Sequence, residues 1–301
     1  MHRGWMEKLR AAILGTGNIG SDLLAKAMRS EVLECSLFAG MHADSSGIAR
    51  ANGLGIRTSH RSISEIIEDP SCCEVVFDAT NAEAHARHAQ ILSKLGKKVF
   101  DMTPSKLGMM CIPLLNLEES LQAPDVNMVS CGGQASIPIA HALLQECKGA
   151  GYVEVVTSIA SKSAGMGTRI NIDEYLRVTR DAIKHFTGAR HAKSILNLNP
   201  AEPPINMQNT IYAEVDFVPD MEKVGARIRQ TVEGMRKFTP GVRLLEEPVF
   251  EGERVTVISE VVGRGDYLPK YAGNLDIITS AAMAVAEEYA RRRKNGTVQR
   301  R

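Results

Sequence analysis

The chain has 301 residues, 44% hydrophobic and 24% charged, with a formal net charge of +1. This length suits two domains and buries enough core to fold without disulfides or structural metals. The near-neutral charge gives no support to a nucleic-acid or membrane-surface partner, and no apolar run reaches the ~18–20 residues of a membrane-spanning helix.

The N-terminal segment starts basic, but its apolar part is only Ala11–Leu14, so we interpret it as the lead into a strand and not as a signal peptide. The cysteines show no CxxC pairing, no metal-ligand spacing and no disulfide framework. A cytoplasmic protein without a metal site is therefore expected. The cysteines are Cys35, Cys72, Cys73, Cys111, Cys131 and Cys147.

The first part of the chain alternates short apolar runs with helical patterns. This alternation predicts a doubly wound α/β domain with a parallel sheet, because parallel neighbours need crossover connections. The expected strands are Ala11–Leu14, Leu33–Ala39, Glu74–Asp78 and Lys98–Asp101, and the expected helices are Ser21–Arg29, Ser62–Glu68 and Ala82–Leu95.

The second part has longer runs with partial alternation, which favour an antiparallel sheet covered on one face. The expected strands are Tyr152–Ala160, Thr210–Phe217 and Arg254–Val262, and the expected helices are Ile172–Phe186 and Asn274–Arg292. We predict a dinucleotide domain over residues 1–130 and a mixed α+β catalytic domain over 131–274. The C-terminal helix, residues 275–301, is expected to pack on the first domain.

A GxGxxG motif follows the first predicted strand and opens the first predicted helix. Its glycines permit a tight turn, close approach of a pyrophosphate, and close helix–strand packing. The helix N-terminus then offers free N–H groups to phosphate. We predict a dinucleotide-binding loop, against the alternative of a structural glycine turn, formed by Gly15, Thr16, Gly17, Asn18, Ile19 and Gly20.

The choice between NAD and NADP depends on the end of the second predicted strand. An acid there would bind the ribose 2′-hydroxyl of NAD. His42 stands at the expected acidic position and Asp44 is two residues late, whereas Ser45, Ser46 and Arg50 are candidates for a 2′-phosphate. The sequence leaves both cofactors open.

Cys131 is the candidate nucleophile. A predicted strand, Asp125–Ser130, leads directly into Cys131, Gly132 and Gly133, and a helical run continues to Cys147. A helix N-terminus lowers a thiol pKa, and backbone N–H groups of the turn are candidates for holding an oxyanion. The alternative is a small buried cysteine. Next to a dinucleotide, a thiolate can form a thiohemiacetal with an aldehyde and, after hydride transfer, a thioester.

Other polar segments follow. Residues 161–169 form a predicted flexible loop with two cations, a candidate for phosphate or nicotinamide-amide binding or an ordinary solvent loop. The turn-like NPAEPP run, residues 199–204, precedes Asn209, which is expected either near the reacting carbonyl or at the end of a turn. His85 and His88 lie one helical turn apart without an evident third ligand, and His141 is too far along its helix to serve Cys131.

Several motifs in order resemble one known family. The segments are GTGNIG, SCGGQA, SKSAGMGTR, NPAEPP and GNLDIITSAA. Together they resemble the acylating (CoA-dependent) acetaldehyde dehydrogenases of aromatic meta-cleavage pathways, over a stretch from about Leu9 to Tyr289.

This resemblance implies a Rossmann domain followed by a mixed α+β catalytic and dimerisation domain like that of the semialdehyde dehydrogenases. It implies oxidation of acetaldehyde or propanal with NAD and coenzyme A to the acyl-CoA, a homodimer, and a complex with 4-hydroxy-2-oxovalerate aldolase that passes the aldehyde through a buried channel. The nucleophile falls on Cys131, and the cofactor segments fall on the GTGNIG loop and on Ser163, Ala164, Gly165, Met166, Gly167, Thr168, Arg169, Asn171 and Asn274.

Two positions depart from the family pattern. Asn209 stands where the family has an aspartate that is implicated in activating a thiol, and an amide cannot carry a proton away. His42 stands where the family commonly has an acid. Two alternatives therefore stay open: a phosphorylating semialdehyde dehydrogenase, and a dinucleotide-binding paralogue without turnover.

Overall fold

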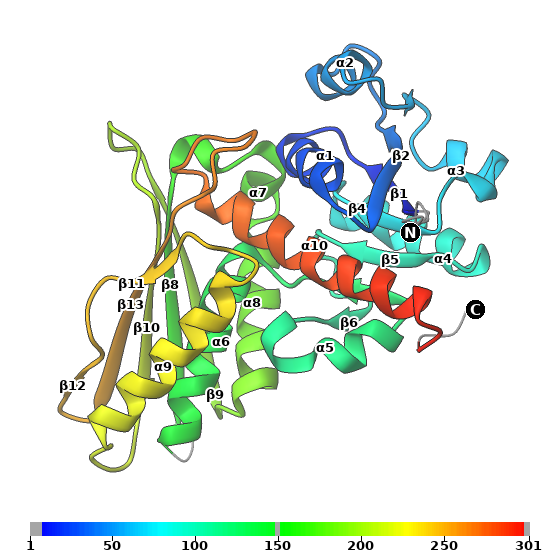
Figure 1. The fold of residues 1–301 in the computed structure, drawn as a ribbon. Coiled ribbons are helices and arrows are strands. Elements are labelled where there is room, and N and C mark those ends of the chain that lie inside the picture. Colours follow the sequence, from blue (N-terminus) through cyan, green and yellow to red (C-terminus); the bar gives the residue numbers. More distant parts are fainter. Residues whose placement is uncertain (1–7, 148–150, 298–301) are drawn as a thin grey trace, which may run out of the picture. The chain divides into compact units, whose positions relative to one another are not determined.

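The computed structural model describes residues 8–147 and 151–297. Within these residues the chain forms two compact units (Figure 1). The first contains residues 8–111, 117–128 and 282–297, and the second contains residues 112–116, 129–147 and 151–281. Residues 298–301, which end the predicted C-terminal helical segment, lie outside the described residues.

The first unit is built on a seven-stranded sheet of order β3-β2-β1-β4-β5-β7-β6, and every strand pair in it is parallel. The doubly wound parallel sheet predicted from the sequence is confirmed. Its strands are β1 (Leu9–Leu14), β2 (Leu33–Ala39), β3 (Thr58–Ser59), β4 (Val75–Asp78), β5 (Lys98–Asp101), β6 (Met109–Met110) and β7 (Asp125–Asn127).

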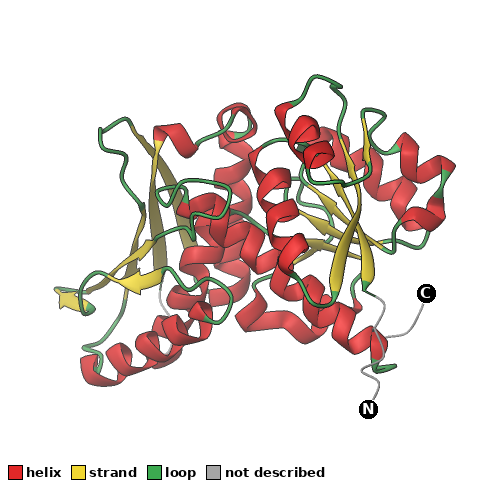
Figure 2. Cartoon of the chain, turned by 45° about the horizontal axis from the view of Figure 1, so that its top comes forward, coloured by secondary structure: helices red, strands yellow, loops and turns green. Residues whose placement is uncertain are grey.

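Helices accompany this sheet, as Figure 2 shows in red beside the yellow strands. Strands β4 and β5 are buried along their whole length, and Phe77 stacks on Phe100 with ring centroids 5.2 Å apart. Burial on both faces of the sheet explains why these strands appear in the sequence as continuous apolar runs. The helical segments are α1 (Asn18–Arg29), α2 (Ser46–Gly53), α3 (Ser64–Glu68), η1 (Pro70–Cys72), α4 (Ala82–Lys94) and α5 (Pro113–Gln122).

The second unit is built on a six-stranded sheet of order β11-β13-β10-β8-β9, with β12 paired to β13. The predicted antiparallel sheet is wrong at one edge, because β8 and β9 pair in parallel. Helix α8 connects these two strands, and such a crossover produces a parallel neighbour. The strands are β8 (Tyr152–Ala160), β9 (His191–Asn199), β10 (Met207–Glu214), β11 (Val242–Leu244), β12 (Val249–Glu251) and β13 (Arg254–Val261).

One face of the second sheet is covered by helices. Helix α6 packs against β8 and β10 and also contacts α8 and α9. Alternate residues of β8 and β10 are buried beneath these helices, whereas the residues between them, such as Val156 and Thr210, are only partly buried. The helical segments are α6 (Cys131–Glu146), η2 (Ser161–Ser163), α7 (Met166–Ile170), α8 (Ile172–Thr187), α9 (Met221–Arg236) and α10 (Gly273–Lys294).

Several predicted segments have other bounds or another form in the structure; helix α1, for example, begins at Asn18 and not at Ser21. The strand expected at Thr210–Phe217 begins at Met207 and ends at Glu214, because the inward-facing Asn209 interrupts the apolar pattern that locates a strand. The strand expected at Asp125–Ser130 ends at Asn127. The segment 161–169 is not a flexible loop, since η2 and the start of α7 occupy it. None of the described helices is long and apolar enough to cross a membrane.

The C-terminal half of α10 belongs to the first unit. The Ser30 hydroxyl donates to Glu287 Oε1 over 2.7 Å, and Arg293 lies 3.2 Å from Glu74. These contacts attach residues 282–297 to the parallel sheet.

A buried ionic cluster joins three strands of the first unit. Asp78 and Asp101 are register partners at the carboxyl ends of β4 and β5, and both are fully buried. His85 of α4 lies between them, with Nδ1 3.0 Å from Asp78 and Nε2 3.4 Å from Asp101 and 3.3 Å from Asp125. His88 Nδ1 lies 2.8 Å from the same oxygen of Asp78.

Burial alone would lower the pKa of His85, but interactions with Asp125 and Asp78 outweigh it and raise the pKa to about 10. Burial would raise the pKa of Asp78, but the two histidines hold it below its usual range. For Asp101 burial prevails and raises the pKa to about 6. His85 is therefore a cation at neutral pH that compensates buried carboxylates.

Replacing that cation should destabilise the first unit. We expect His85→Asn to lower the free energy of unfolding by about 3–5 kcal/mol, because it leaves buried carboxylates without their partner. The folded-state pKa of His85 lies above its unfolded value, so its contribution is complete below about pH 6.5 and is lost as the pH rises through about 10.

Urea unfolding of both proteins between pH 6 and pH 10 measures this difference. His60→Asn, at an exposed position of the same unit, is the matched control and should change stability by less than about 0.5 kcal/mol. A His85 effect as small as that of His60, or one that grows with pH, would contradict the account.

Candidate active site

The glycine-rich loop lies where the order of the parallel sheet reverses, between β1 and β4. Gly15 directly follows β1 with a φ of +102°, and a Cβ there would lie 2.4 Å from the carbonyl oxygen of Ala79. A Cβ on Gly20 would lie 1.8 Å from the carbonyl oxygen of Gly15, whereas Gly17 has no atom within 4 Å of its Cβ position. The first and third glycines therefore serve the fold, and Gly17 borders open space.

The N-terminus of α1 is suited to an anion. Gly17 is its N-cap residue and supplies no side-chain hydrogen bond, whereas α4 and α6 are capped by the side chains of Asn81 and Ser130. The uncapped N–H groups and the positive end of the helix dipole favour phosphate. These features fit the pyrophosphate of a dinucleotide.

The loop after β2 is attached to this glycine loop. The hydroxyl of Thr16 lies 2.8 Å from that of Ser45, and a Cβ on Gly47 would lie 2.1 Å from the carbonyl oxygen of Thr16. His42 and Asp44 are exposed on the same connection. The residues that the sequence associated with the adenosine ribose thus lie on the connection that is held to the phosphate loop.

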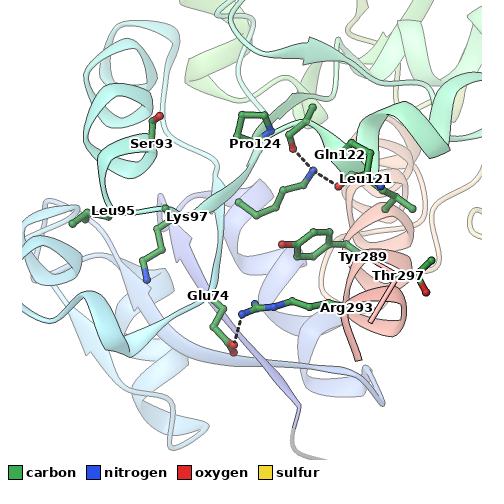
Figure 3. A pocket seen from close by; sticks show the side chains of 13 residues that line it. Glu74, Ser93, Leu95, Lys97, Leu121, Gln122, Pro124, Tyr289, Arg293 and Thr297 are labelled. Atoms are coloured by element: carbon green, nitrogen blue, oxygen red, sulfur yellow. Dashed lines mark hydrogen bonds and ion pairs between the residues drawn. The ribbon is translucent and has the colours of Figure 1, made fainter. Parts of the chain in front are cut away.

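A cavity of about 610 Å³ opens elsewhere in the first unit (Figure 3). Glu74, Lys97 and Pro124 line it at the amino ends of β4, β5 and β7, the edge opposite to the glycine loop. Its cations are engaged: Arg293 pairs with Glu74, as Figure 3 shows. Lys97 donates to the carbonyl oxygens of Pro70 and Cys73, and Lys98 donates to those of Ser120 and Leu121. Ligands of such sheets bind at the carboxyl edge, so this cavity is not the dinucleotide site.

Cys131 is the first residue of α6 and is half-buried. The preceding Val129 has a φ of +62°, which is strained for a β-branched residue, and it turns the chain sharply into the helix. The Ser130 hydroxyl caps the helix by accepting the Gly133 N–H over 2.9 Å, and it lies 2.6 Å from the Thr179 hydroxyl of α8. The nucleophile candidate therefore stands on a sharp turn that side chains hold in place.

Tyr175 of α8 is the second support of this turn. Its hydroxyl oxygen accepts the Gly132 N–H over 3.1 Å and lies 3.6 Å from Cys131 Sγ. A Cβ on Gly132 would lie 2.3 Å from the Tyr175 hydroxyl and 2.6 Å from that of Thr157, so only glycine fits there. Because both the Gly132 and Gly133 N–H groups are paired, the expectation that they hold an oxyanion is wrong for these two groups.

Burial raises the pKa of the Cys131 thiol, although the Tyr175 hydroxyl and the Gly132 N–H act in the opposite direction. The expectation of a lowered pKa from the helix N-terminus is thus not met, because desolvation of the thiolate outweighs these hydrogen bonds. Burial and the neighbouring Cys131 raise the pKa of Tyr175 well above its ordinary value, so its phenol stays neutral.

Asn209 lies within β10 and not at the end of a turn. It pairs in register with Thr157 of β8 and Ser259 of β13, and all three side chains are fully buried beneath α6. The Thr157 hydroxyl donates to Asn209 Oδ1 over 2.9 Å, while Asn209 Nδ2 has no partner among the described residues. The structure thus links Asn209, through Thr157, to the hydroxyls around Gly132.

The predicted cofactor residues of the second unit form their own group. Arg169 donates to the carbonyl oxygens of Ala164 and Ser161, and Lys162 pairs with Glu202, so both cations are engaged within the protein. The role of this segment in binding phosphate or the nicotinamide amide therefore stays a prediction. The Asn171 side chain likewise donates back to Gly167. Gly165 and Thr168 lie in the same short segment, and of Met166 only the backbone is described.

Asn274 is brought beside Ser163. Its Nδ2 lies 3.5 Å from the Ser163 carbonyl oxygen, and its side chain is almost fully buried. Asn274 Oδ1 has no hydrogen-bond partner within the described residues. A buried acceptor without a donor fits a ligand amide such as that of nicotinamide.

Tyr175, Thr157 and Thr179 were not predicted as site residues. Tyr175 and Thr179 lie four residues apart on the buried face of α8. The two hydroxyls on this otherwise apolar helix face are the sequence feature that could have indicated their role. No local sequence pattern could have indicated Thr157 as a site residue, because only the strand register places it beside Asn209.

Residues 131–269 match a family model described as "Prokaryotic acetaldehyde dehydrogenase, dimerisation". A curated acetaldehyde dehydrogenase from Pectobacterium atrosepticum is 52% identical over 283 residues, which cover 93% of this chain and 95% of that protein. The chain belongs to the acetaldehyde dehydrogenase family. An acetaldehyde dehydrogenase from Geobacillus stearothermophilus is 46% identical over 287 residues, which cover 95% of this chain and 97% of that protein.

Among solved structures, aspartate semialdehyde dehydrogenase II from Vibrio cholerae, complexed with ASA, matches with a TM-score of 0.66 and 12% identity. The match covers 95% of this chain and 99% of that chain, and it supports the fold alone. The predicted family and its oxidoreductase class are confirmed by the relatives, and membership in a dehydrogenase family implies a nicotinamide dinucleotide cofactor. The dimerisation model supports a homodimer.

A matched pair of glycine substitutions tests the loop. We expect Gly20→Ala to lower the free energy of unfolding by about 2–3 kcal/mol, because its Cβ would strike the Gly15 carbonyl. Gly17→Ala should leave stability unchanged but weaken dinucleotide binding by about tenfold or more, because it narrows the space for phosphate. Thermal unfolding and fluorescence titration with NADH and NADPH measure both. Equal stability losses in the two variants would argue against the assigned roles.

Proposed function

We propose that this protein is an acylating acetaldehyde dehydrogenase, which oxidises acetaldehyde or propanal to the acyl-CoA with NAD(P) and coenzyme A. The observation that carries the proposal is the position of Cys131, half-buried at the first turn of α6 with Tyr175 against its sulfur. Family membership and the uncapped glycine loop of α1 support the dehydrogenase part.

The reaction begins when the Cys131 thiol loses its proton to solvent. The thiolate sulfur attacks the aldehyde carbon, so that a C–S bond forms, the carbonyl π bond breaks, and a thiohemiacetal oxyanion results. A dinucleotide held by the loop from Gly15 to Gly20 would supply the hydride acceptor for this carbon. The C=O bond re-forms as the hydride leaves, and a thioester remains on Cys131.

Coenzyme A completes the cycle as a co-substrate. Its thiolate attacks the thioester carbonyl, the bond to Cys131 Sγ breaks, and acyl-CoA leaves while the Cys131 thiolate is regenerated. One aldehyde, one coenzyme A and one oxidised dinucleotide thus give one acyl-CoA, one reduced dinucleotide and one proton. Asn209 has no carboxylate and takes no proton in this scheme.

The proposed cofactor residues form two groups. The loop from Gly15 to Gly20 would hold the pyrophosphate at the N-terminus of α1. Asn274 and Ser163 would receive the nicotinamide amide, because Asn274 Oδ1 is a buried acceptor without a donor. We place the catalytic domain at residues 131–274 and the dinucleotide domain at 1–130 with the C-terminal helix.

We further propose a cytoplasmic homodimer that works with 4-hydroxy-2-oxovalerate aldolase. The matched dimerisation model and the partly buried outer face of the second sheet support the dimer. On that face Ile195, Val156, Thr210 and Ile258 form one cross-strand row. The aldolase partner is supported by the family resemblance of the five sequence motifs.

Replacing the nucleophile tests the mechanism. We expect Cys131→Ala to lower kcat by about 10⁴-fold or more while dinucleotide binding survives, because no other group forms the thioester. Cys35→Ala, at another half-buried cysteine, should keep wild-type turnover. The readout is the near-ultraviolet absorbance of the reduced cofactor. Full turnover by Cys131→Ala would refute the mechanism.

The acceptor is tested in the same assay. We expect that repeated turnover of acetaldehyde or propanal, measured as cofactor reduction, requires coenzyme A. Parallel runs with NAD and NADP identify the preferred dinucleotide. Turnover of a semialdehyde with phosphate instead of coenzyme A would establish the phosphorylating alternative. Dinucleotide binding without any turnover would establish the non-catalytic one.

A further inference from the structure

The Tyr175 hydroxyl lies against the Cys131 sulfur. Its oxygen lies 3.6 Å from Sγ, and the tyrosine side chain is only 7% exposed. The groups that shift the pKa of Cys131 are its burial, this hydroxyl, and the backbone N–H groups of Gly132 and Cys131, none of which carries a charge. A buried neutral phenol is therefore the group placed to respond to the charge on sulfur.

Asn209, Thr157 and Tyr175 form a short chain of polar groups, and Asn209 sets the direction of the hydrogen bonds along it. Asn209 Oδ1 can only accept, so the Thr157 hydroxyl proton points to it over 2.9 Å. The Thr157 hydroxyl also lies beside that of Tyr175, since a Cβ on Gly132 would lie 2.6 Å from the first and 2.3 Å from the second, and a side-chain hydrogen bond with Thr157 acts on the pKa of Tyr175. Because the Thr157 proton is committed to Asn209, Thr157 offers a lone pair to the Tyr175 proton.

The two protonation states of Cys131 then use Tyr175 differently. The thiol donates to the Tyr175 oxygen, and the Tyr175 proton points to Thr157. The thiolate has no proton to donate, so the Tyr175 O–H can turn to the sulfur, while its oxygen keeps the Gly132 N–H over 3.1 Å. That N–H polarises the phenol and strengthens it as a donor.

Tyr175 cannot act as a base in this position. Burial and the nearby Cys131 raise its pKa well above the ordinary value, so its proton stays on oxygen. Asn209 has no ionisable group to take a proton either. What the arrangement supplies is a hydrogen bond whose direction changes with the charge on sulfur.

We propose that Tyr175 is a further catalytic residue, whose hydroxyl donates a hydrogen bond to the Cys131 thiolate, and that Thr157 and Asn209 position this hydroxyl. The inference rests on the proposed role of Cys131. The thiolate occurs twice in the cycle, as the attacking group and as the group expelled by coenzyme A, so the same donor stabilises both states. No proton is transferred by Tyr175 in either step.

The test measures the thiol directly. Iodoacetamide labels Cys131 in the full-length protein as a function of pH, and mass spectrometry of the Cys131 peptide gives the midpoint of its reactivity. We expect Tyr175→Phe to raise this midpoint by about one pH unit and to lower kcat at pH 7 by about tenfold, with unchanged dinucleotide affinity.

Thr157→Val distinguishes this role from a purely structural one, because the proposal predicts a shift of the labelling midpoint in the direction opposite to that of Tyr175→Phe. It removes the competing acceptor while keeping the shape of the side chain, so the Tyr175 proton is left to the sulfur. We expect the labelling midpoint to move down, opposite to Tyr175→Phe. Tyr152→Phe, which loses a hydrogen bond to Glu154 at the start of β8, is the control and should leave the midpoint unchanged.

An unchanged or lowered midpoint in folded Tyr175→Phe would overturn the proposal. Should that variant fail to fold, the Thr157→Val midpoint decides: a decrease supports the proposal and an increase or no change overturns it. Failure of the proposed function would appear separately, as turnover by Cys131→Ala, because labelling does not depend on aldehyde oxidation.

Discussion

The burial of the Cys131 thiol, the proposed nucleophile, is the constraint on which the surroundings of the first turn of α6 depend. Burial raises the pKa of Cys131, and the surrounding groups recover part of that cost through hydrogen bonds instead of charges. Each of these bonds requires a defined backbone. Gly132 must lack a Cβ to admit the Tyr175 hydroxyl, and Val129 must adopt a positive φ to turn the strand into the helix. The strain and the missing side chain both serve the placement of one sulfur atom.

Helix α8 is the scaffold for this placement. Its Tyr175 and Thr179, one turn apart, reach the first turn of α6 through Gly132 and Ser130. The sheet beneath contributes Thr157 and Asn209 from adjacent strands. A buried polar network of this kind is stable only when its members are paired, which ties the strand register of β8 and β10 to the geometry around Cys131.

The first unit also buries groups that carry charge, and there an opposite charge compensates them. Its parallel strands end in Asp78 and Asp101, and His85 provides the cation that makes their burial tolerable. Close by, the reversal of strand order between β1 and β4 leaves the uncapped N-terminus of α1 beside the carboxyl edge of the sheet. The ionic cluster thus stabilises the same edge of the sheet at which the glycine-rich loop lies.

The sequence predicted those features that local patterns encode. Apolar runs and the spacing of Gly15, Gly17 and Gly20 located the parallel sheet and its loop, and a cysteine before two glycines located the start of α6. Features that depend on strand register, or on contacts between helices far apart in the sequence, could not be predicted from local patterns. The sequence left Asn209 either near the reacting carbonyl or at the end of a turn, because a polar residue in an apolar pattern does not reveal an inward-facing strand position. Tyr175 was missed because it lies 44 residues from Cys131, and only the fold brings them together.

The central claim, that Cys131 carries the acyl group, is tested most directly by trapping it. The protein is mixed with acetaldehyde and oxidised dinucleotide without coenzyme A, quenched in acid, and digested for mass spectrometry. The account predicts one acetyl group on the Cys131 peptide, formed with about one equivalent of reduced cofactor per site and removed when coenzyme A is added before the quench. Reduced cofactor formed over many turnovers with no acyl group on Cys131 at any time would contradict it.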